Sequence, residues 1–384
     1  MLIGLDASRL APTSSALPGR TGTETYSFHL LRHLLALRSG HRFRLYLRGP
    51  LAAGVLPTGA NAEERVIRLP RLWTHVGLSW EMACRPPDVL FIPAHVVPLL
   101  HPRRTVVTVH DLGYRLYPQA HRRWDRLYLE LSTRWSVRVA RIVLADSQAT
   151  ANDLRRFYGA PTEKVRVVYP GRDESLAPVR DPAALATVQA QYGLHGRYIL
   201  HIGTLQPRKN LTRLVEAFAE VLRRRPELSD LCLVLAGKKG WLYEGLFRRV
   251  AELGLQGRVL FPGYVPDADL PALLSGAACF AFPSLYEGFG FPVLEAQACG
   301  APVVCSDAAS LPEVAGEGAL LVAPHDTAAW ADALTRVLTD EELRARLAAR
   351  GFVNVARFSW HRCAKEVLQA LEDAGQGSNQ RAAR

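Results

Sequence analysis

Short runs of apolar residues recur along the chain and alternate with longer stretches in which apolar residues return every three or four positions. The short runs predict buried β-strands, and the longer stretches predict amphipathic helices. In the first half of the chain, strands are predicted at 2–7, 42–48, 88–95, 104–111 and 141–147, and a helix at 23–37. Strands and helices in this order predict a parallel sheet covered by helices on both faces.

The alternation stops between residues 171 and 196, where prolines and charged residues replace the apolar runs. It resumes with predicted strands at 197–204, 231–237, 258–265, 278–284 and 301–307, and with helices that begin near 210 and 242. We therefore predict an α/β fold of two doubly wound Rossmann-like domains, 1–175 and 197–358, joined by a linker at 176–196 and facing across a cleft. A last helix at 359–374 is expected to cross back to the first domain, and the tail 375–384 is expected to be disordered.

The composition, 48% hydrophobic and 22% charged, is typical of a globular protein. The formal net charge is +11, and only five of the 47 basic residues are lysines. Two interpretations of this charge remain open. It reflects either a codon bias of the whole genome or a partner that carries phosphates or forms an anionic membrane surface.

The six cysteines form no C-x-x-C motif and lie mostly among apolar or small residues, which predicts reduced thiols. The start MLIGLDASRL has neither the basic residues nor the apolar run of a signal peptide. No apolar run approaches the roughly 20 residues of a membrane-spanning helix. A cytoplasmic protein is expected, either soluble or bound peripherally to a membrane.

Several polar residues follow predicted strands, where doubly wound sheets bind their ligands. Gly22 stands just before a helix, where a glycine lets backbone N–H groups approach an anion, although a flexible loop explains it equally well. His110 and Asp111 end the strand at 104–111. Both side chains bond hydroxyls and titrate, so they are candidates for a site, and a histidine buried in the core is the alternative.

The segment GTLQPRKNLTRLVEAF places Arg208 and Lys209 directly before a long helix that Asn210 could cap. Two cations beside a helix N-terminus favour a diphosphate, and a solvated basic turn is the alternative. Further along, Tyr264 and Val265 lie in a turn after a strand, where backbone groups could contact a nucleobase.

The segment FPSLYEGFGFPVLEAQACGAPVV holds two glutamates eight positions apart. Pro292 suits the start of a helix, so Glu287 is predicted in the loop and Glu295 on the first helical turn. A carboxylate has two acceptor oxygens, which match the two hydroxyls of a sugar diol. Paired carboxylates also occur in glycoside hydrolases, but a hydrolase has no use for diphosphate-binding cations.

The segment YEGFGFPVLEA, preceded by VHDLGY and GTLQPRKN, resembles the motifs of the retaining GT-B glycosyltransferases of family 4. The resemblance covers nearly the whole chain and is densest from 197 to 325. It implies the GT-B fold, a nucleotide-sugar donor bound by the second domain, and a saccharide or lipid-linked acceptor bound by the first.

For the diphosphate, the resemblance implies contacts from Arg208 and Lys209 and an approach by Gly22 from the first domain. It assigns Glu295 to the ribose hydroxyls. Many members carry an arginine where this chain has Thr204, which makes diphosphate binding depend more on the two neighbouring cations.

For the sugar, the resemblance implies contacts from Glu287 and from the backbone of Gly288, Phe289 and Gly290, with His110 near the primary hydroxyl. The family reaction retains anomeric configuration and requires neither a metal nor another cofactor. We hypothesise front-face transfer, in which a donor phosphate oxygen takes the acceptor proton. The less favoured version makes Glu287 a covalent nucleophile.

Two further segments bear on the acceptor. Residues 120–143 predict a basic helix with Trp124, Tyr128 and Trp135, and residues 69–85 add Trp73 and Trp80. Such helices can lie on anionic bilayers, although packing of one face against the core explains the pattern too.

The donor is predicted to be GDP-mannose, on overall similarity to polysaccharide mannosyltransferases, and UDP-glucose or another UDP-hexose is the alternative. Two other classes of protein fit the sequence less well. A nucleotide-sugar 2-epimerase would lack this pair of glutamates, and no motif for reading nucleic acid accompanies the basic charge.

Overall fold

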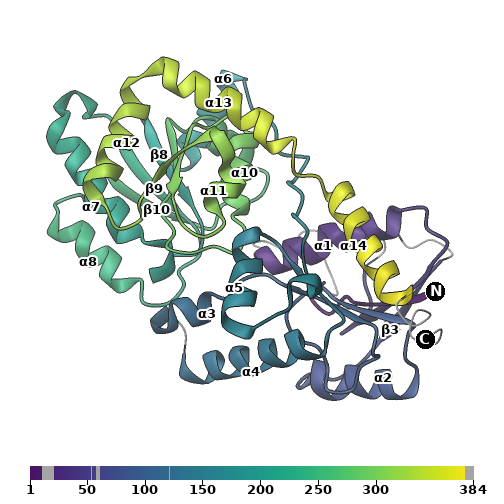
Figure 1. Ribbon diagram of the computed structural model, residues 1–384. Helices are drawn as coiled ribbons and strands as arrows, with labels where there is room; N and C mark the ends of the chain where they lie inside the picture. Colours follow the sequence, from purple (N-terminus) through teal and green to yellow (C-terminus); the bar gives the residue numbers. More distant parts are fainter. Residues whose placement is uncertain (11–20, 53, 58–60, 121, 377–384) are drawn as a thin grey trace. The chain divides into compact units, whose positions relative to one another are not determined.

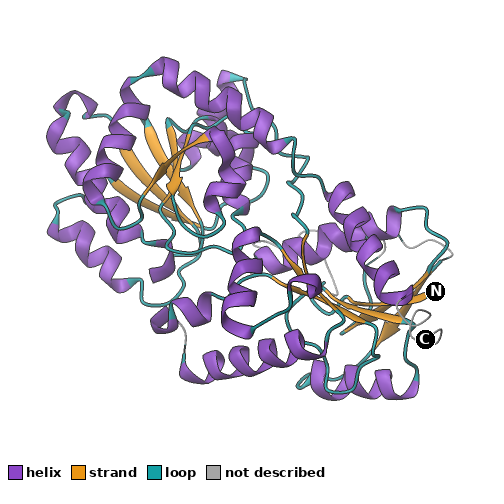
Figure 2. Cartoon of the chain, in the orientation of Figure 1, coloured by secondary structure: helices purple, strands orange, loops and turns teal. Residues whose placement is uncertain are grey.

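The computed structural model describes residues 1–10, 21–52, 54–57, 61–120 and 122–376, which form two compact units. Unit 1 holds the chain up to Gly171 and again from Phe358, and unit 2 holds Arg172–Arg357. The sequence predicted that the first domain ends at residue 175 and the second at residue 358. In each unit a sheet, orange in Figure 2, has helices on both faces.

Unit 1 is built on seven parallel strands. Their order in the sheet is β3 (Ala62–Val66), β2 (Arg42–Leu47), β1 (Leu2–Asp6), β4 (Val89–Ile92), β5 (Thr105–Val109), β6 (Ile142–Ala145) and β7 (Val165–Val167). In the register of β1, Ile3 lies between Phe43 of β2 and Val89 of β4. The strands β4, β5 and β6 are buried along their whole length, as parallel strands covered on both faces must be.

The helices of unit 1 include one from the far end of the chain. They are α1 (Gly22–Ala36), α2 (Ser79–Cys84), α3 (Gly113–Leu116), α4 (Arg123–Val139), α5 (Gln148–Tyr158) and α14 (Trp360–Gln376), with short turns η1 (Trp73–Leu78), η2 (Pro118–Ala120) and η3 (Thr162–Lys164). Helix α14 packs on α1, where the rings of His29 and Trp360 stack with centroids 5.3 Å apart (Figure 1). The predicted tail 375–384 begins inside α14, and its residues 377–384 lie outside the described residues.

Unit 2 is built on six parallel strands. Their order is β10 (Val259–Gly263), β9 (Cys232–Ala236), β8 (Tyr198–Ile202), β11 (Cys279–Phe282), β12 (Val303–Ser306) and β13 (Ala319–Val322). The strands β9, β11 and β12 are again buried throughout, and the sheet packs on helices through a large apolar cluster that includes Phe218 and Trp330.

The first helix of unit 2 lies inside the segment predicted as a linker. They are α6 (Pro182–Gln191), α7 (Leu211–Arg224), α8 (Glu244–Glu252), α9 (Leu270–Ser275), α10 (Phe291–Ala298), α11 (Leu311–Ala315), α12 (Thr327–Thr339) and α13 (Glu341–Val355), with turns η4 (Pro207–Lys209), η5 (Pro226–Leu228) and η6 (Gly316–Gly318). Helix α6 begins where the side chain of Asp181 accepts a hydrogen bond from the amide of Ala183, with Pro182 in its first turn. The segment 176–196 therefore includes a helix that belongs to unit 2 and packs on α9.

Candidate functional site

The strand order of unit 2 brings the two loops with the predicted donor-binding residues next to each other. The chain adds β9 and β10 on one side of β8, and then β11, β12 and β13 on the other side. The direction of winding therefore reverses between β8 and β11, which are neighbours in the sheet. Doubly wound sheets bind ligands beyond the carboxyl ends of the strands at such a reversal.

Glu287, on the loop after β11, is buried and accepts hydrogen bonds from three side chains. Lys209 Nζ donates to Oε1 at 2.6 Å, and Ser284 Oγ donates to the same oxygen at 2.5 Å. Arg208 Nη1 donates to Oε2 at 3.1 Å. The two cations belong to η4, which follows β8, so this ion cluster joins the two loops at the reversal.

The charge of this cluster is set by its cations. Burial raises the pKa of Glu287, but the charges of Arg208 and Lys209 and the hydrogen bonds from Lys209 and Ser284 reverse this effect and lower the pKa to about 2. The carboxylate is therefore ionised at neutral pH and is a weak base. Two cations with one carboxylate leave a net positive charge, which suits an anionic ligand.

Asn210 does not cap α7 in the way that its sequence position suggests. It occupies the N-cap position with a left-handed backbone, at φ = 56°, and its side chain makes no capping hydrogen bond. Its Nδ2 instead donates to the carbonyl of Pro324 at 2.6 Å. The side chain thus ties the η4 turn to the segment after β13, because the left-handed backbone points it away from the first turn of the helix.

The backbone of Gly288, Phe289 and Gly290 follows Glu287 into α10, as predicted. Gly290 has φ = 118°, a conformation that other residues rarely adopt, and an added Cβ would lie 2.9 Å from Leu311. The hydroxyl of the fully buried Ser310 lies 2.9 Å from the carbonyl oxygen of Glu287 and 2.6 Å from that of Phe289. Ser310 therefore fixes the turn that presents these three residues.

Glu295 lies one turn further along α10 than predicted. The helix begins at Phe291, so Glu295 belongs to the second turn and the first turn has no acidic residue. Burial, together with the negative charges of Asp173 and Asp267, raises its pKa to about 7. Among the described residues, none donates a hydrogen bond to its carboxyl group.

His201, on β8, lies beneath the ion cluster and was not predicted. It is fully buried, its Nδ1 donates to the carbonyl of Ala281 at 3.0 Å, and its Nε2 has no partner among the described residues. Its ring stacks on Phe282, whose centroid lies 4.8 Å from Lys209 Nζ. Burial, and then the charge of Lys209, lower the pKa of His201 to about 3, so the ring is neutral at neutral pH.

The predicted base-contacting residues lie after β10, at the outer edge of the sheet. Val265 is buried, and the hydroxyl of Tyr264 donates to Asp267 Oδ1 at 3.3 Å. The ammonium of Lys238, at the end of the neighbouring β9, lies 5.3 Å from the Tyr264 ring centroid. These residues border the same end of the sheet as the ion cluster.

In unit 1, His110 uses both of its ring nitrogens. Nδ1 lies 2.5 Å from the carboxylate of Asp146, and Nε2 lies 2.8 Å from the carbonyl oxygen of Pro93. The carbonyl of Pro93 can only accept, so Nε2 carries a proton, and Nδ1 is paired with the carboxyl group of Asp146. Burial lowers the pKa of His110, the charge of Asp146 raises it, and the net effect is a raised pKa. In this structure neither nitrogen remains for a sugar hydroxyl.

Asp111 lies beside a histidine that the sequence did not single out. The Asp111 carboxylate accepts from the amide of Gly113 at 2.9 Å, and its carbonyl accepts from His95 Nε2 at 3.2 Å. His95 has a left-handed backbone, at φ = 54°, which is strained for a residue with a side chain. Burial, and then the charge of His110, lower its pKa to about 4, so its ring is neutral.

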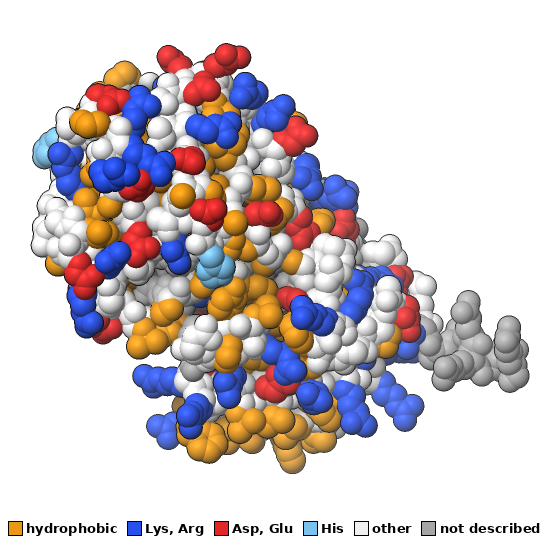
Figure 3. Space-filling model, turned by 60° about the vertical axis from the view of Figure 1, so that its left-hand side comes forward, with side chains coloured by type: hydrophobic (Ala, Val, Ile, Leu, Met, Phe, Trp, Pro, Cys, Tyr) orange, Lys and Arg blue, Asp and Glu red, His pale blue; other side chains and the backbone are white. Residues whose placement is uncertain are grey.

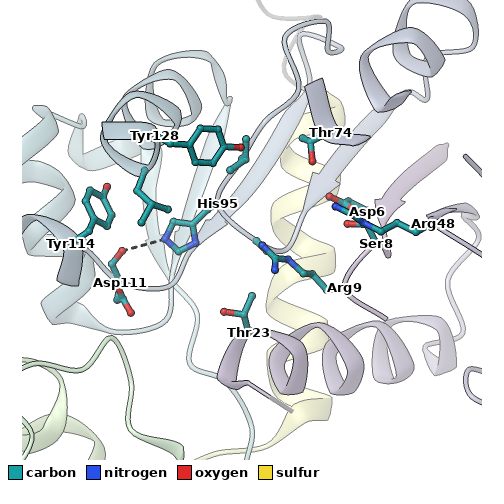
Figure 4. Close-up of a pocket in the computed structure, with 13 residues that line it drawn as sticks. Asp6, Ser8, Arg9, Thr23, Arg48, Thr74, His95, Asp111, Tyr114 and Tyr128 are labelled. Atoms are coloured by element: carbon teal, nitrogen blue, oxygen red, sulfur yellow. Dashed lines mark hydrogen bonds between the residues drawn. The ribbon is translucent and has the colours of Figure 1, made fainter. Parts of the chain in front are cut away.

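A cavity of about 340 Å³ opens between β1, β4, α1 and α4 of unit 1. Figure 4 shows the side chains that surround it, with His95 and its hydrogen bond to Asp111 on one side and Arg9 and Thr23 facing it. The strand order reverses here too, between β1 and β4. The charged and polar side chains of its wall include Asp6, Arg9, Thr23, Arg48, His95 and Asp111.

Gly22 begins α1 beside this cavity, since the following residue, Thr23, lines it. The helix start is closed by a capping box: Glu24 accepts from the amide of Thr21 at 2.8 Å, and Thr21 accepts from the amide of Glu24. Gly22, which was predicted to approach the diphosphate, therefore lies at a helix N-terminus that the capping box already orders.

Within the described ranges, no three His, Cys, Asp or Glu side chains are grouped so as to hold a metal ion. Asp267 and Asp269 have the spacing of an Asp-x-Asp motif, but the Asp269 carboxylate accepts from Gln191 at 2.9 Å and from Tyr192 at 2.6 Å. The six cysteines are free thiols, and five of them are buried. None of the described helices is long and apolar enough to cross a bilayer.

Comparison with known proteins places these features in a family. Residues 190–354 match the family Glycosyl transferases group 1, and residues 20–176 match Glycosyltransferase Family 4. Over 274 residues, 70% of this chain and 70% of the relative, the sequence is 35% identical to O-antigen chain mannosyltransferase B of Escherichia coli. It is 32% identical over 284 residues, 72% of this chain and 66% of the relative, to D-inositol 3-phosphate glycosyltransferase of Corynebacterium efficiens.

Among solved structures, sucrose-phosphate synthase from Thermosynechococcus elongatus superposes with a TM-score of 0.75. The alignment covers 97% of this chain and 98% of that protein at 23% sequence identity. This likeness confirms the predicted fold class, two Rossmann-like domains of the GT-B type.

Proposed function

The chain belongs to the group 1 glycosyl transferases and is a hexosyltransferase, and from this premise we propose that it moves a mannosyl residue from GDP-mannose to a saccharide or lipid-linked saccharide. The observation that carries the proposal is the ion cluster of Arg208, Lys209 and Glu287 at the reversal of the unit 2 sheet. The similarity to a mannosyltransferase favours mannose. A UDP-hexose donor is the alternative.

In the proposed complex, the donor diphosphate takes over the two cations of the cluster. A diphosphate has more negative charge than a single carboxylate, so Arg208 and Lys209 turn towards it and the Glu287 oxygens become acceptors for sugar hydroxyls. Gly288, Phe289 and Gly290 contribute backbone groups on the same turn, and Glu295 accepts from the ribose diol. The cations then stabilise the charge that develops on the leaving nucleoside diphosphate.

The proposed transfer retains the anomeric configuration. The bond between the anomeric carbon and the donor phosphate oxygen breaks, the acceptor oxygen bonds to the same face of that carbon, and the acceptor proton passes to the leaving phosphate oxygen. In the proposed complex, Ser284 and the sugar hydroxyls donate to the Glu287 oxygens, so this carboxylate binds the sugar and is not the nucleophile that we favour.

We expect a single nucleotide-sugar to raise the melting temperature of the protein, with GDP-mannose first and UDP-glucose second in order of expectation. A ligand that binds the folded state alone stabilises it by mass action. Because the proposed mechanism needs no metal and no other cofactor, the shift should be the same with and without EDTA. No shift with any nucleotide-sugar, or a shift that EDTA abolishes, would count against the proposal.

We expect nucleotide affinity to rise as the pH is raised through about 7. With its pKa raised to about 7, Glu295 is partly protonated in the free protein at neutral pH. Ribose hydroxyls donate to the ionised carboxylate, so binding favours ionisation, releases a proton and tightens as the pH rises. Titration calorimetry across this range measures the slope, and Glu295→Gln should flatten it. An unchanged slope in Glu295→Gln would assign the pH dependence to another group.

The proposed location is the cytoplasm, with peripheral attachment to the inner face of the cell membrane. The attachment is proposed because the aromatic residues Trp124 and Tyr128 of the basic helix α4 are exposed and do not pack into the core.

A further inference from the structure

Helix α4 carries a stripe of large apolar side chains on its solvent side. Trp124, Leu127, Tyr128 and Leu131 have the spacing that puts side chains on one helical face, and all four are exposed. Trp124 is 81% exposed and Leu131 is 57% exposed. The buried face of the same helix holds Ser132, Thr133, Ser136 and Val137. The same helix also packs Leu129, Trp135 and Val139 against the core, so α4 has large apolar side chains on its exposed face as well as on its buried one, unlike an ordinary surface helix.

A second stripe lies beside the first. Leu72, Val76 and Trp80 follow one another at intervals of four residues along η1 and α2, with Leu72 67% exposed and Trp80 71% exposed. The hydrogen bond between His75 Nε2 and the hydroxyl of Tyr128, at 3.1 Å, joins this segment to α4.

The loop that holds the exposed Leu99 and Leu100 completes the surface. The amide of Leu100 donates to Ser79 Oγ of α2 at 3.3 Å, and the amide of Val97 donates to Ser136 Oγ of α4 at 3.0 Å. Two helical segments and this loop are therefore held together, and their exposed residues Leu72, Val76, Trp80, Leu99, Leu100, Trp124, Leu127 and Leu131 are together called the apolar surface.

Arginines surround the apolar surface. Arg122, Arg123 and Arg126 alternate with its residues on α4, and Arg71 and Arg103 flank the other two segments; all five are exposed. Figure 3 shows hydrophobic side chains gathered along its lower edge with Lys and Arg side chains beside them. That view is turned about the vertical axis only, so its lower edge is the one where Figure 1 draws α4 and α2.

We propose that the apolar surface docks on a bilayer that contains anionic lipids. An exposed apolar patch of this extent marks an interaction site, and its arginine rim complements phosphate headgroups while the tryptophans enter the interface. A second copy of the chain would instead bring two arginine rims together, which disfavours a symmetric dimer on this surface. Tyr128 borders both the surface and the unit 1 cavity, so docking brings the mouth of that cavity to the bilayer.

This inference deepens the proposed function. If the chain transfers the sugar as proposed, docking implies that the acceptor is a saccharide presented on a lipid at the membrane, and this consequence rests on the proposed function. The docking itself is independent of the donor site, which belongs to unit 2. A test of docking can therefore fail while the proposed transfer stands, and the proposed transfer can fail while docking is confirmed.

The test is sedimentation of the full-length protein with vesicles, either of phosphatidylcholine alone or of phosphatidylcholine mixed with phosphatidylglycerol. We expect binding to the anionic vesicles, weakened by salt, with a fluorescence blue shift as the tryptophans enter the bilayer. The double variant Trp80→Ser/Trp124→Ser should have a partition coefficient lower by about tenfold or more, because it lacks both indoles that contact the membrane interface. Each of Arg123→Gln and Arg126→Gln should reduce it by about fivefold on anionic vesicles only.

The matched control is Trp241→Ser, which removes an exposed tryptophan from unit 2 and should leave vesicle binding unchanged. Melting shifts with the nucleotide-sugar should be the same in all of these variants, because the donor site is intact. Absence of vesicle binding, or binding that the two tryptophan substitutions do not weaken, overturns the proposal. A dimer in analytical ultracentrifugation that Trp124→Ser converts to a monomer overturns it too, in favour of a second copy.

Discussion

Replacing Glu287 with glutamine is expected to lower kcat by about 100-fold or more, with a change in donor nucleotide affinity of no more than about threefold. The amide has nearly the shape of the carboxylate, so the turn held by Ser310 should stay in place. It lacks the negative charge that orders Arg208 and Lys209. The donor sugar would also lose the charged acceptor for its hydroxyls. Steady-state kinetics with the donor that shifts the melting temperature, together with direct binding of the nucleoside diphosphate, separate the two effects.

The control for this variant is Glu295→Gln, the same change eight residues along the chain. Its effect should be the opposite: a loss of nucleotide affinity and a smaller loss of kcat. A melting temperature for each variant shows whether the buried cations tolerate the loss of their carboxylate, since removing one partner of a buried ion pair destabilises a protein by about 3 to 5 kcal/mol. If Glu287→Gln binds the nucleotide much more weakly and turns over normally once saturated, the proposed role for Glu287 is wrong. Accumulation of a sugar adduct on the wild-type Glu287 would replace front-face transfer by a covalent mechanism.

The sequence pattern was sufficient for the central strands of both sheets and for one edge strand, β10, and not for the other three edge strands. The strands without a prediction are β3, β7 and β13, and each of them is the last strand on one side of its sheet. The residues of β3 read Ala-Glu-Glu-Arg-Val and are mostly exposed, while β7 has only three residues. An edge strand is covered on fewer sides, so its sequence need not be an apolar run, as β3 and β7 show.

The loops of the donor site could be predicted because they follow strands that the apolar pattern predicts. Arg208, Lys209 and Glu287 follow apolar strands, and the carboxyl ends of parallel strands meet at one edge of the sheet. Ser284, Ser310 and His201 could not be predicted, because a buried serine or histidine acquires its role only from the groups that the fold brings to it. Ser310 lies on the segment before α11, and nothing in its local sequence indicates that its hydroxyl contacts the carbonyls of Glu287 and Phe289.

The ion pairs among the predicted donor-binding residues could not be predicted from the sequence either. Arg208 and Lys209 were assigned to phosphate and Glu287 to sugar, yet in the structure the cations and the carboxylate bind each other. A cluster of this kind keeps the cations ordered and desolvated before the donor arrives. The exchange of partners on binding then costs less reorganisation than ordering two long side chains from solvent.

Replacing Lys209 with methionine is expected to weaken binding of the nucleoside diphosphate by about 30-fold or more, which corresponds to about 2 kcal/mol for one charge-assisted contact. Binding of the nucleoside without phosphates should change by less than about threefold, because the lost ammonium contacts phosphate and neither base nor ribose. Methionine keeps most of the apolar length of the lysine, so its packing on Phe282 is largely preserved. Titration calorimetry with the nucleoside, its monophosphate and its diphosphate measures how the loss depends on the number of phosphates.

The matched control is Lys239→Met, on the loop after the neighbouring β9, where the ammonium lies 5.5 Å from the Tyr243 ring centroid and is not part of the ion cluster. This variant should bind the diphosphate nearly as well as the wild type. An equal loss for nucleoside and diphosphate in Lys209→Met would mean that the lysine supports the shape of the pocket through Glu287 and does not contact phosphate. A loss that increases with each phosphate added, and that Lys239→Met does not reproduce, is the result that the exchange of ion partners requires, because only then does the ammonium leave the Glu287 carboxylate for the donor.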